Sequence, residues 1–395
     1  MAELRLLYIA NQYFPSTYVD SLQVLRTLTA LARQGLEITL ALPKLLRVPP
    51  ERDERVRHRI ETYYGLSLAG LHLRFLPTWF RTARQFEKDL PGMMLAWGNG
   101  LPTHDLIYTR YYLPLLAAGL SGKPVLFESH YDLPRLYPRR FTFLRWLARQ
   151  EHCIGLVTNS AMTSGIMREN GIPAPLVVTA YNGYEVEQFA EPRSREEARR
   201  ALGLPAKGSM VLYGGGTGGN KNLAFLLRLA ERVPEAEFYL AGPPTEELRA
   251  EAGRLKNFHL MGWLEPRRYP LALWAADALF IPPSDPRQPR YANTLLPIKV
   301  FQYLAAGRPI VASDQRDLRE VLDETTAALF PGDRVDEAAV ILRKVLRDRV
   351  YASRLGEAAR VRAPAYTWDA RAVVLVDFLR RRKEVLARFA TGSPR

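Results

Sequence analysis

The sequence contains one cysteine, Cys153, and six histidines among its 395 residues. A single thiol excludes an internal disulfide, a cysteine-based zinc cluster and a CxxC redox pair, because each needs at least two cysteines. This cysteine usage is typical of a reducing compartment, so we expect a cytoplasmic protein. The histidines are scattered, and Asp285 and Asp314 stand isolated without the spacing of metal ligands. We therefore expect neither a bound metal nor a cofactor.

Long apolar runs are also missing. No stretch reaches the ~20 apolar residues that a membrane-spanning helix needs. The best late candidate, residues 271–281, is short and contains Asp277. The first ten residues, MAELRLLYIA, lack the basic segment and the cleavage site of a secretory signal. Any membrane contact is therefore expected to be peripheral, on the inner face of the membrane.

Positive charge, by contrast, is abundant. The net charge of +14 indicates an anionic ligand, a nucleic acid or a membrane surface as a partner. The composition, 47% hydrophobic and 24% charged, is that of a soluble globular protein and excludes collagen, coiled-coil and low-complexity chains. At roughly 150 residues per domain, the length favours two domains.

Strand-like and helix-like segments alternate along the chain in two series, which predicts an α/β protein with two Rossmann-like, doubly wound domains. The first series has strands at residues 4–9, 38–42, 71–76, 105–108, 125–127 and 154–158, with a helix at 21–33. The second has strands at residues 210–213, 237–241, 259–261, 278–281 and 310–312, and helices at 223–232, 269–276, 297–306 and 317–322.

The polar residues 187–209 predict a connection between the domains, with a boundary near Phe189. We expect an N-terminal domain of residues 1–188 and a C-terminal domain of residues 189–368. A last helix, around residues 370–386 within the segment 369–390, is expected to return to the N-terminal domain. Ligands of such folds bind at the carboxyl ends of the strands, so functional residues are expected in the loops that follow them.

The first such loop has the sequence YGGGTGGNKN, residues 213–222, between a strand and a helix. Glycines let the backbone approach an anion, the helix N-terminus adds partial positive charge, and Lys221 adds a full charge. A diphosphate is the expected ligand. Asn222 follows the lysine, so the segment is not a Walker A motif. The alternative is a flexible turn with an incidental lysine.

The second segment, residues 291–314, contains Pro297 at the expected first turn of a helix. The backbone N–H groups of the preceding loop would be free to bind an anion or sugar hydroxyls; the loop comprises Asn293, Thr294, Leu295 and Leu296. Lys299 falls in the first turn, where the helix dipole disfavours a cation, and a bound phosphate would remove that conflict. The alternative is a lysine that extends into solvent.

This segment, with PIKVFQYLAAGRPIVAS at its centre, resembles the signature of the retaining GT-B glycosyltransferases of family 4, group 1. The similarity covers nearly the whole chain. Further matching segments, each weak alone but specific in their order, are NQYFPSTYVDSLQVL, DLIYTR, VLFESHYDLP, VTAYNGYEVEQF, FHLMGWL, LWAADALFIPPS, DLREVL and YTWDAR.

The resemblance implies a GT-B fold with two domains facing a central cleft, a nucleoside diphosphate sugar as donor, and metal-independent transfer with retention. Lys221 would neutralise the diphosphate, and His130 matches the active-site histidine of the family, the alternative being a structural histidine after a strand. The expected catalytic residues are His130, Lys221 and Lys299. The expected donor-side residues are Gly215, Gly216, Asn220, Lys221, Trp263, Asn293, Thr294, Leu295, Leu296, Lys299 and Gln302. The expected acceptor-side residues are Ser16, Thr17, Tyr18 and Arg110.

Three positions depart from the family pattern. The two glutamates usual in the family are replaced by Thr294 and Gln302, so neither position carries a charge. Gln302 still offers an amide to ribose hydroxyls. The arginine usual after the glycine of the first loop is replaced by Gly216, and Lys299 would take its place.

A third segment, residues 135–150, is basic and aromatic and includes Arg139, Arg140, Arg145 and Trp146. It could lie on anionic lipid, with aromatic rings at the interface, or it is an amphipathic helix with a solvated face. No RRM, KH or helix-turn-helix pattern accompanies it, so we expect no nucleic-acid partner.

The sequence thus predicts a glycosyltransferase that acts on a saccharide or lipid-linked acceptor in envelope polysaccharide or glycolipid synthesis. Two other functions remain open from the residues. A degenerate sugar-nucleotide-binding or scaffold protein would explain the missing glutamates. A GT-B-type sugar-nucleotide epimerase would need acid and base side chains that the sequence has in short supply.

Overall fold

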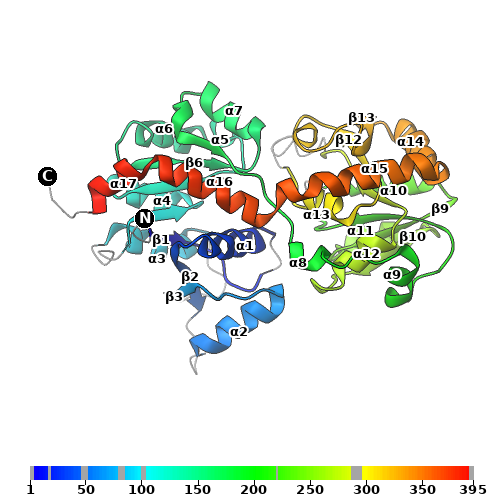
Figure 1. Ribbon diagram of the computed structural model, residues 1–395, viewed down its shortest axis with the longest axis horizontal. Helices are drawn as coiled ribbons and strands as arrows, with labels where there is room; N and C mark the ends of the chain where they lie inside the picture. The colour runs from blue at the N-terminus through cyan, green and yellow to red at the C-terminus, as the bar shows by residue number, and fades with distance from the viewer. Residues whose placement is uncertain are drawn as a thin grey trace. The chain divides into compact units, whose positions relative to one another are not determined.

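A computed structural model describes residues 4–16, 19–45, 52–78, 85–98, 104–218, 221–285 and 296–390. The chain folds into two compact units, and each has the α/β architecture expected from the alternating segments (Figure 1). The first unit comprises Met1–Tyr181 and Trp368–Arg395, and the second comprises Asn182–Thr367.

The described part of the first unit is built on a seven-stranded parallel sheet in the order β3-β2-β1-β4-β5-β6-β7. In chain order the strands are β1 (Arg5–Ile9), β2 (Glu37–Leu45), β3 (Leu71–Thr78), β4 (Leu106–Thr109), β5 (Val125–Glu128), β6 (Cys153–Thr158) and β7 (Val177–Thr179). The central strands β4, β5 and β6 are buried at every residue, as expected for a parallel sheet with helices on both faces. The six predicted strands of this unit are confirmed, and β7 was not predicted.

Helices from both ends of the chain cover this sheet (Figure 1). They are α1 (Val19–Arg33), α2 (Asp53–Tyr64), α3 (Gln85–Trp97), α4 (Tyr112–Leu120), α5 (Leu133–Leu136), α6 (Pro138–Leu147), α7 (Ala161–Glu169), α16 (Trp368–Arg381) and α17 (Lys383–Ala390). The helix α16 packs against α1. Its Phe378 ring occupies the space where a Cβ on Gly155 would lie, so the glycine in β6 admits the helix close to the sheet.

The second unit contains a six-stranded parallel sheet in the order β10-β9-β8-β11-β12-β13. Its strands are β8 (Ser209–Gly214), β9 (Ala236–Ala241), β10 (Phe258–Gly262), β11 (Ala278–Ile281), β12 (Ile310–Asp314) and β13 (Ala327–Pro331). Its helices are α8 (Val186–Phe189), α9 (Arg195–Leu202), α10 (Leu223–Arg232), α11 (Glu246–Ala252), α12 (Tyr269–Ala275), α13 (Lys299–Ala306), α14 (Val335–Arg347) and α15 (Arg349–Arg362). Phe225, Phe280 and Phe330 stack in its core with ring centroids 5.5–6.2 Å apart.

The boundary between the units lies at Tyr181 and Asn182, several residues before the predicted position. Tyr184 already belongs to the second unit, because its N–H donates to the Tyr366 carbonyl at 3.2 Å. Phe189 packs on Trp274 in the same unit, with the ring centroids 5.8 Å apart. The two segments that join the units therefore contact each other within the second unit, through Tyr184 and Tyr366.

Four expectations about local structure are wrong. The supposed connection 187–209 contains the helix α9, which begins at a capping box of Ser194 and Glu197 that was overlooked. The predicted helix 317–322 is only a 3₁₀ turn, Leu318–Glu320. The helix expected from Pro297 begins at Lys299. The predicted last helix is two helices, α16 and α17, and β13, α14 and α15 were not predicted.

None of the helices in the described residues combines the length and the apolar character needed to cross a membrane.

Gly242, which follows β9, should be intolerant of any side chain. A Cβ at this position would overlap the backbone oxygen of Gly215, which cannot move away without displacing the loop after β8. We expect Gly242→Ala to lower the free energy of unfolding by about 1–3 kcal/mol in urea denaturation. Gly216→Ala is the control, because a Cβ there has no neighbour within 4 Å. Equal stability of the two variants would contradict this packing.

Candidate functional site

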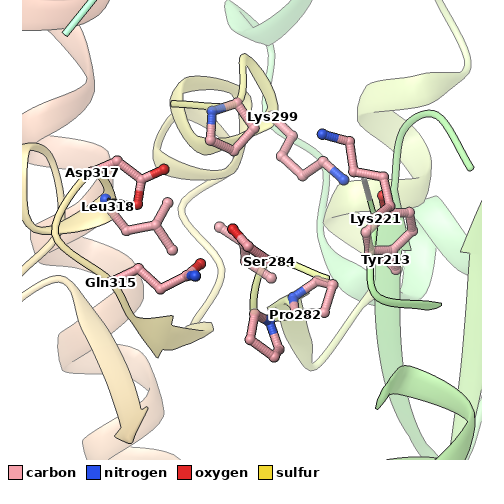
Figure 2. A pocket seen from close by; sticks show the side chains of 11 residues that line it. Tyr213, Lys221, Pro282, Ser284, Lys299, Gln315, Asp317 and Leu318 are labelled. Carbon is pink, nitrogen blue, oxygen red and sulfur yellow. Dashed lines mark hydrogen bonds between the residues drawn. The ribbon is translucent and has the colours of Figure 1, made fainter. Parts of the chain in front are cut away.

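A pocket of about 470 Å³ lies in the second unit where β8, β11 and β12 end (Figure 2). Its wall is built from these strand ends and the start of α13, as expected for a ligand site in a parallel α/β sheet. The lining residues are Tyr213, Lys221, Ile281, Pro282, Pro283, Ser284, Pro297, Lys299, Gln315, Asp317 and Leu318.

Two lysines meet on one side of this pocket (Figure 2). Lys299 is only 8% exposed, and its Nζ lies 3.5 Å from the centre of the Tyr213 ring, a cation–π contact. Burial lowers the pKa of Lys299 well below its usual value, and the nearby Lys221 ammonium lowers it further. Burial also lowers the pKa of Lys221. The sequence alternative of a Lys299 that extends into solvent is therefore wrong.

Neither lysine forms an ion pair with a carboxylate within the described part of the chain. Two adjacent, desolvated ammonium groups repel each other and disfavour their own charge. An anion with several oxygens would remove both penalties at once and accept hydrogen bonds from both groups. The pocket is therefore suited to a phosphate or diphosphate.

Gly215 leaves room for the end of the Lys299 side chain. It adopts φ +128°, and a Cβ there would lie 3.1 Å from both Cε and Nζ of Lys299. The Gly215 N–H donates to Ala241 O at 2.8 Å, and the Tyr213 hydroxyl donates to Gly216 O at 2.8 Å. The glycine-rich loop is thus held rigidly around the lysine, at least as far as Gly216.

Asp317 stands on the opposite side of the pocket, with its carboxylate turned toward the interior (Figure 2). It is 3% exposed, and its Oδ1 accepts a hydrogen bond from Leu318 N at 2.9 Å. Burial raises the pKa of Asp317 to about 6, against the hydrogen bond and the attraction of Lys221. The pocket is therefore cationic on one side and carries a carboxylate on the other.

The remaining donor-side residues lie in different places. Gln302 donates from Nε2 to Glu185 Oε2 at 3.2 Å and does not line the pocket. Leu296 is buried just before α13, and Trp263 is half exposed after β10. Asn220, Asn293, Thr294 and Leu295 lie outside the described residues.

In the first unit, His130 belongs to a buried polar cluster at the end of β5. Its Nε2 lies 2.5 Å from Glu128 Oε1, and the same oxygen accepts from Arg371 Nη2 at 2.7 Å. Burial would raise the pKa of Glu128, but Arg371 and the His130 hydrogen bond hold it far below its usual value. Burial and Arg110 lower the pKa of His130, although Glu128 opposes them. The cluster therefore contains a carboxylate and a neutral imidazole at pH 7.

His130 and Arg110 line one pocket of about 620 Å³, whose other polar residues include Tyr137 and Arg140. Ser16 does not line this pocket: its N–H donates to the Tyr64 hydroxyl at 2.8 Å. Thr17 and Tyr18 lie outside the described residues.

Sequence reasoning missed three residues of these sites. Glu128 stands two residues before His130 at a strand end, so the alternation of side chains could have revealed it. Asp317 follows β12 and could have been found from its place after a strand. Arg371 lies 243 residues from Glu128, and no local pattern connects the two. Among the described residues, no group of three or more His, Cys, Asp or Glu is placed to hold a metal ion.

Comparison with known families gives two matches. The family described as Glycosyltransferase Family 4 matches residues 22–188, and the family described as Glycosyl transferases group 1 matches residues 208–348.

Similar curated proteins are glycosyltransferases. A sulfoquinovosyl transferase of Arabidopsis thaliana is 27% identical over 65% of this chain, and the chain spans only about half (51%) of that protein's length. A D-inositol 3-phosphate glycosyltransferase of Xylanimonas cellulosilytica is 23% identical over 90% of this chain and 89% of its own length.

Solved structures share the fold. Anabaena HepE in complex with UDP and glucose has a TM-score of 0.72 at 14% identity, covering 96% of this chain and 100% of that chain. Sucrose-phosphate synthase from Thermosynechococcus elongatus has a TM-score of 0.74 at 18% identity, covering 96% and 99%.

Removal of the Lys299 charge should change anion binding and protein stability in opposite directions. Lys299→Met keeps the buried stem and removes the ammonium. We expect it to weaken the binding of inorganic pyrophosphate by about 10- to 150-fold in calorimetry, since a hydrogen bond to a charged group contributes about 1.5–3 kcal/mol. The unliganded variant should be at least as stable as the wild type, because a desolvated cation is lost.

Lys344→Met is the matched control. Lys344 also lies over a tyrosine ring, that of Tyr351 at 4.5 Å, but it is exposed on α14, away from the pocket. It should leave pyrophosphate affinity unchanged. Equal affinities of all three proteins would remove Lys299 from the anion site.

Proposed function

The chain belongs to the family 4, group 1 glycosyltransferases with the GT-B fold, and we propose that its donor is a nucleoside diphosphate sugar. The observation that carries this proposal is the pair of lysines, the partly buried Lys221 and the buried Lys299, in one pocket at the strand ends of the second unit. HepE, which shares the fold, was solved with UDP and glucose, and this makes UDP-glucose the first donor to test.

The proposed reaction replaces one C–O bond by another with retention at the anomeric carbon. The bond from the anomeric carbon to the diphosphate oxygen breaks, and a bond to the acceptor hydroxyl oxygen forms. The hydroxyl proton passes to the leaving diphosphate. Lys221 and Lys299 stabilise the negative charge that develops on the diphosphate, in the role that a metal ion serves in other transferases. Transfer should therefore not require a metal.

Asp317 is proposed to accept hydrogen bonds from hydroxyls of the donor sugar. It faces the lysines across the same pocket, so a diphosphate held by the lysines brings the attached sugar toward it. Its carboxylate is the charged acceptor that the pocket retains although positions 294 and 302 carry Thr294 and Gln302.

The acceptor is proposed to bind in the first unit, at the pocket shared by His130 and Arg110. Arg140 lies over the rings of Tyr112 and Tyr137, 5.0 and 4.8 Å from their centroids, so the wall combines cations with aromatic faces. Such a wall suits a saccharide that carries an anionic group, including a lipid-linked one.

We propose a role in envelope polysaccharide or glycolipid synthesis, on the inner face of an anionic membrane, and the exposed face of α6 supports this proposal. The helix α6 buries Phe141, Leu144 and Leu147 and leaves Arg145 and Trp146 exposed. One face of the folded helix packs in the core, as the amphipathic-helix interpretation expected, and we propose that the other offers arginine and an aromatic ring to anionic headgroups.

The reaction can be tested directly. The purified chain is incubated with UDP-glucose, EDTA and D-inositol 3-phosphate or a glycolipid extract, and the products are followed by NMR. We expect UDP release coupled to an α-linked product, which keeps the configuration of the donor, at an unchanged rate in EDTA. A strict magnesium requirement would contradict metal independence, and an inverted product would contradict retention. Donor binding without turnover indicates a binding protein, and an epimerised donor indicates an epimerase.

Asp317→Asn separates sugar recognition from diphosphate binding. The amide keeps an oxygen for the Leu318 N–H and loses the charge. We expect the affinity for UDP-glucose to fall by about tenfold, since a charge-assisted hydrogen bond becomes a neutral one. The affinity for UDP should stay the same or rise. Calorimetry that shows equal losses for UDP and UDP-glucose would place Asp317 away from the sugar.

A further inference from the structure

The cluster behind His130 connects it to the helix on which the chain returns to the first unit. We propose that Arg371 is a positioning residue for His130, acting through Glu128. This inference rests on the proposed function only in assigning His130 to the reaction, because the cluster itself lies wholly in the first unit.

The Arg371 side chain is 2% exposed and forms hydrogen bonds in three directions. Its Nη2 donates to Glu128 Oε1 at 2.7 Å, and its Nε donates to Thr27 Oγ1 at 3.1 Å. Its Nη1 donates to the carbonyl oxygen of Ala180, next to the last residue of the first unit's main segment. A planar guanidinium with fixed donor directions can satisfy these partners together, whereas a lysine cannot.

Glu128 is thereby fixed in one orientation. Its Oε1 accepts from Gln23 Nε2 at 2.9 Å as well as from Arg371, and its Oε2 accepts from the Tyr108 hydroxyl. The carboxylate is 2% exposed, so without a cation beside it the charge would be strongly disfavoured. Arg371 is the group that keeps Glu128 ionised and available to His130.

An ionised Glu128 sets the tautomer of His130. A carboxylate has no proton to give, so His130 Nε2 must donate the hydrogen bond between them. In the neutral ring the other nitrogen, Nδ1, is then an acceptor. His130 also lines the 620 Å³ pocket, so the tautomer decides whether the imidazole accepts or donates a hydrogen bond there.

The charges around His130 come from several elements. Glu128 is the last residue of β5, two residues before His130, and Tyr108 and Arg110 lie at the end of β4. Arg371 lies on α16, and Arg140, on α6, lines the same pocket. Burial, Arg110 and Arg371 lower the pKa of His130, and Glu128 raises it. Removal of Arg371 should therefore let the Glu128–His130 pair take up a proton at a higher pH, either on the ring or on the carboxyl group.

The experiment uses imidazole ¹⁵N NMR of the full chain without substrate, with the His130 signals assigned by their loss in His130→Gln. In the wild type we expect a neutral ring with Nε2 protonated. In Arg371→Gln we expect the apparent pKa of the pair to rise by one unit or more, and the Nδ1 signal to change. With UDP-glucose and an acceptor, kcat should fall on the order of tenfold, with UDP affinity unchanged.

Arg33→Met is the matched control. Arg33 also joins α1 to α16, through an exposed ion pair with Asp369 at 2.7 Å, but it does not contact Glu128. It should leave the His130 spectrum and kcat unchanged. An unchanged His130 spectrum in Arg371→Gln, or an equal change in Arg33→Met, would overturn the proposal.

A second variant covers the case in which Arg371→Gln fails to fold because Glu128 is left without its cation. The double variant Arg371→Met, Glu128→Gln removes both charges together, which tolerates burial better. The amide introduced at position 128 would both donate and accept, so we expect a mixture of the two His130 tautomers. A pure Nε2-protonated ring in the double variant would overturn the proposal. If the NMR results hold but no sugar transfer is found, the proposed function fails and the positioning role stands.

Discussion

The second unit contains two lysine ammonium groups, those of Lys221 and Lys299, in surroundings that disfavour a positive charge. Lys299 is the first residue of α13, at the end of a helix where the dipole already opposes a cation, and its side chain is buried. The Tyr213 ring offers the face of a π-system to its Nζ. That contact offsets only part of the cost of removing the charge from water. The unliganded pocket is therefore electrostatically incomplete, and an anion completes it.

Several features of the surrounding fold serve this arrangement. The Tyr303 hydroxyl accepts a hydrogen bond from Gly214 N at 2.7 Å, which fixes the end of β8. Gly242 allows the Gly215 carbonyl to lie against β9, and Gly215 leaves space for the Lys299 side chain. Close packing therefore accounts for glycine at positions 215 and 242.

The sequence predicts most of the fold, because buried parallel strands read as short apolar runs. It predicted the eleven strands that were named in the two series, and it omitted the short apolar strands β7 and β13. Other failures occurred where the signal was polar or non-local. The helix α9 is mostly charged, yet its Arg199 is 3% exposed and donates to Asp277 at 2.7 Å, so a tertiary ion pair stabilises it. The helix at 317–322 failed because the Asp317 side chain bonds the adjacent N–H and closes only one short turn.

The residues of the candidate sites also divide into those that the local sequence predicts and those that only the tertiary structure brings together. Lys221, Lys299 and His130 stand in loops or at element ends next to strands, so local pattern and family resemblance located them. Arg371 is specified only by the packing of α16 on α1, and its contact with Glu128 is invisible in either segment alone. Long-range polar contacts of this kind form only in the tertiary structure, so the spacing of residues along the sequence does not reveal them.

The glutamine at position 302, where the family usually has a glutamate, has a physical explanation in this structure. Its amide donates to Glu185, a carboxylate that is 2% exposed and lies in the same unit. A glutamate at position 302 has no N–H to donate, and it would bring a second carboxylate to about the same 3.2 Å separation, where like charges repel. Glutamine supplies the N–H for the hydrogen bond and avoids that repulsion. The two residues therefore constrain each other: a carboxylate at either position favours an amide at its neighbour.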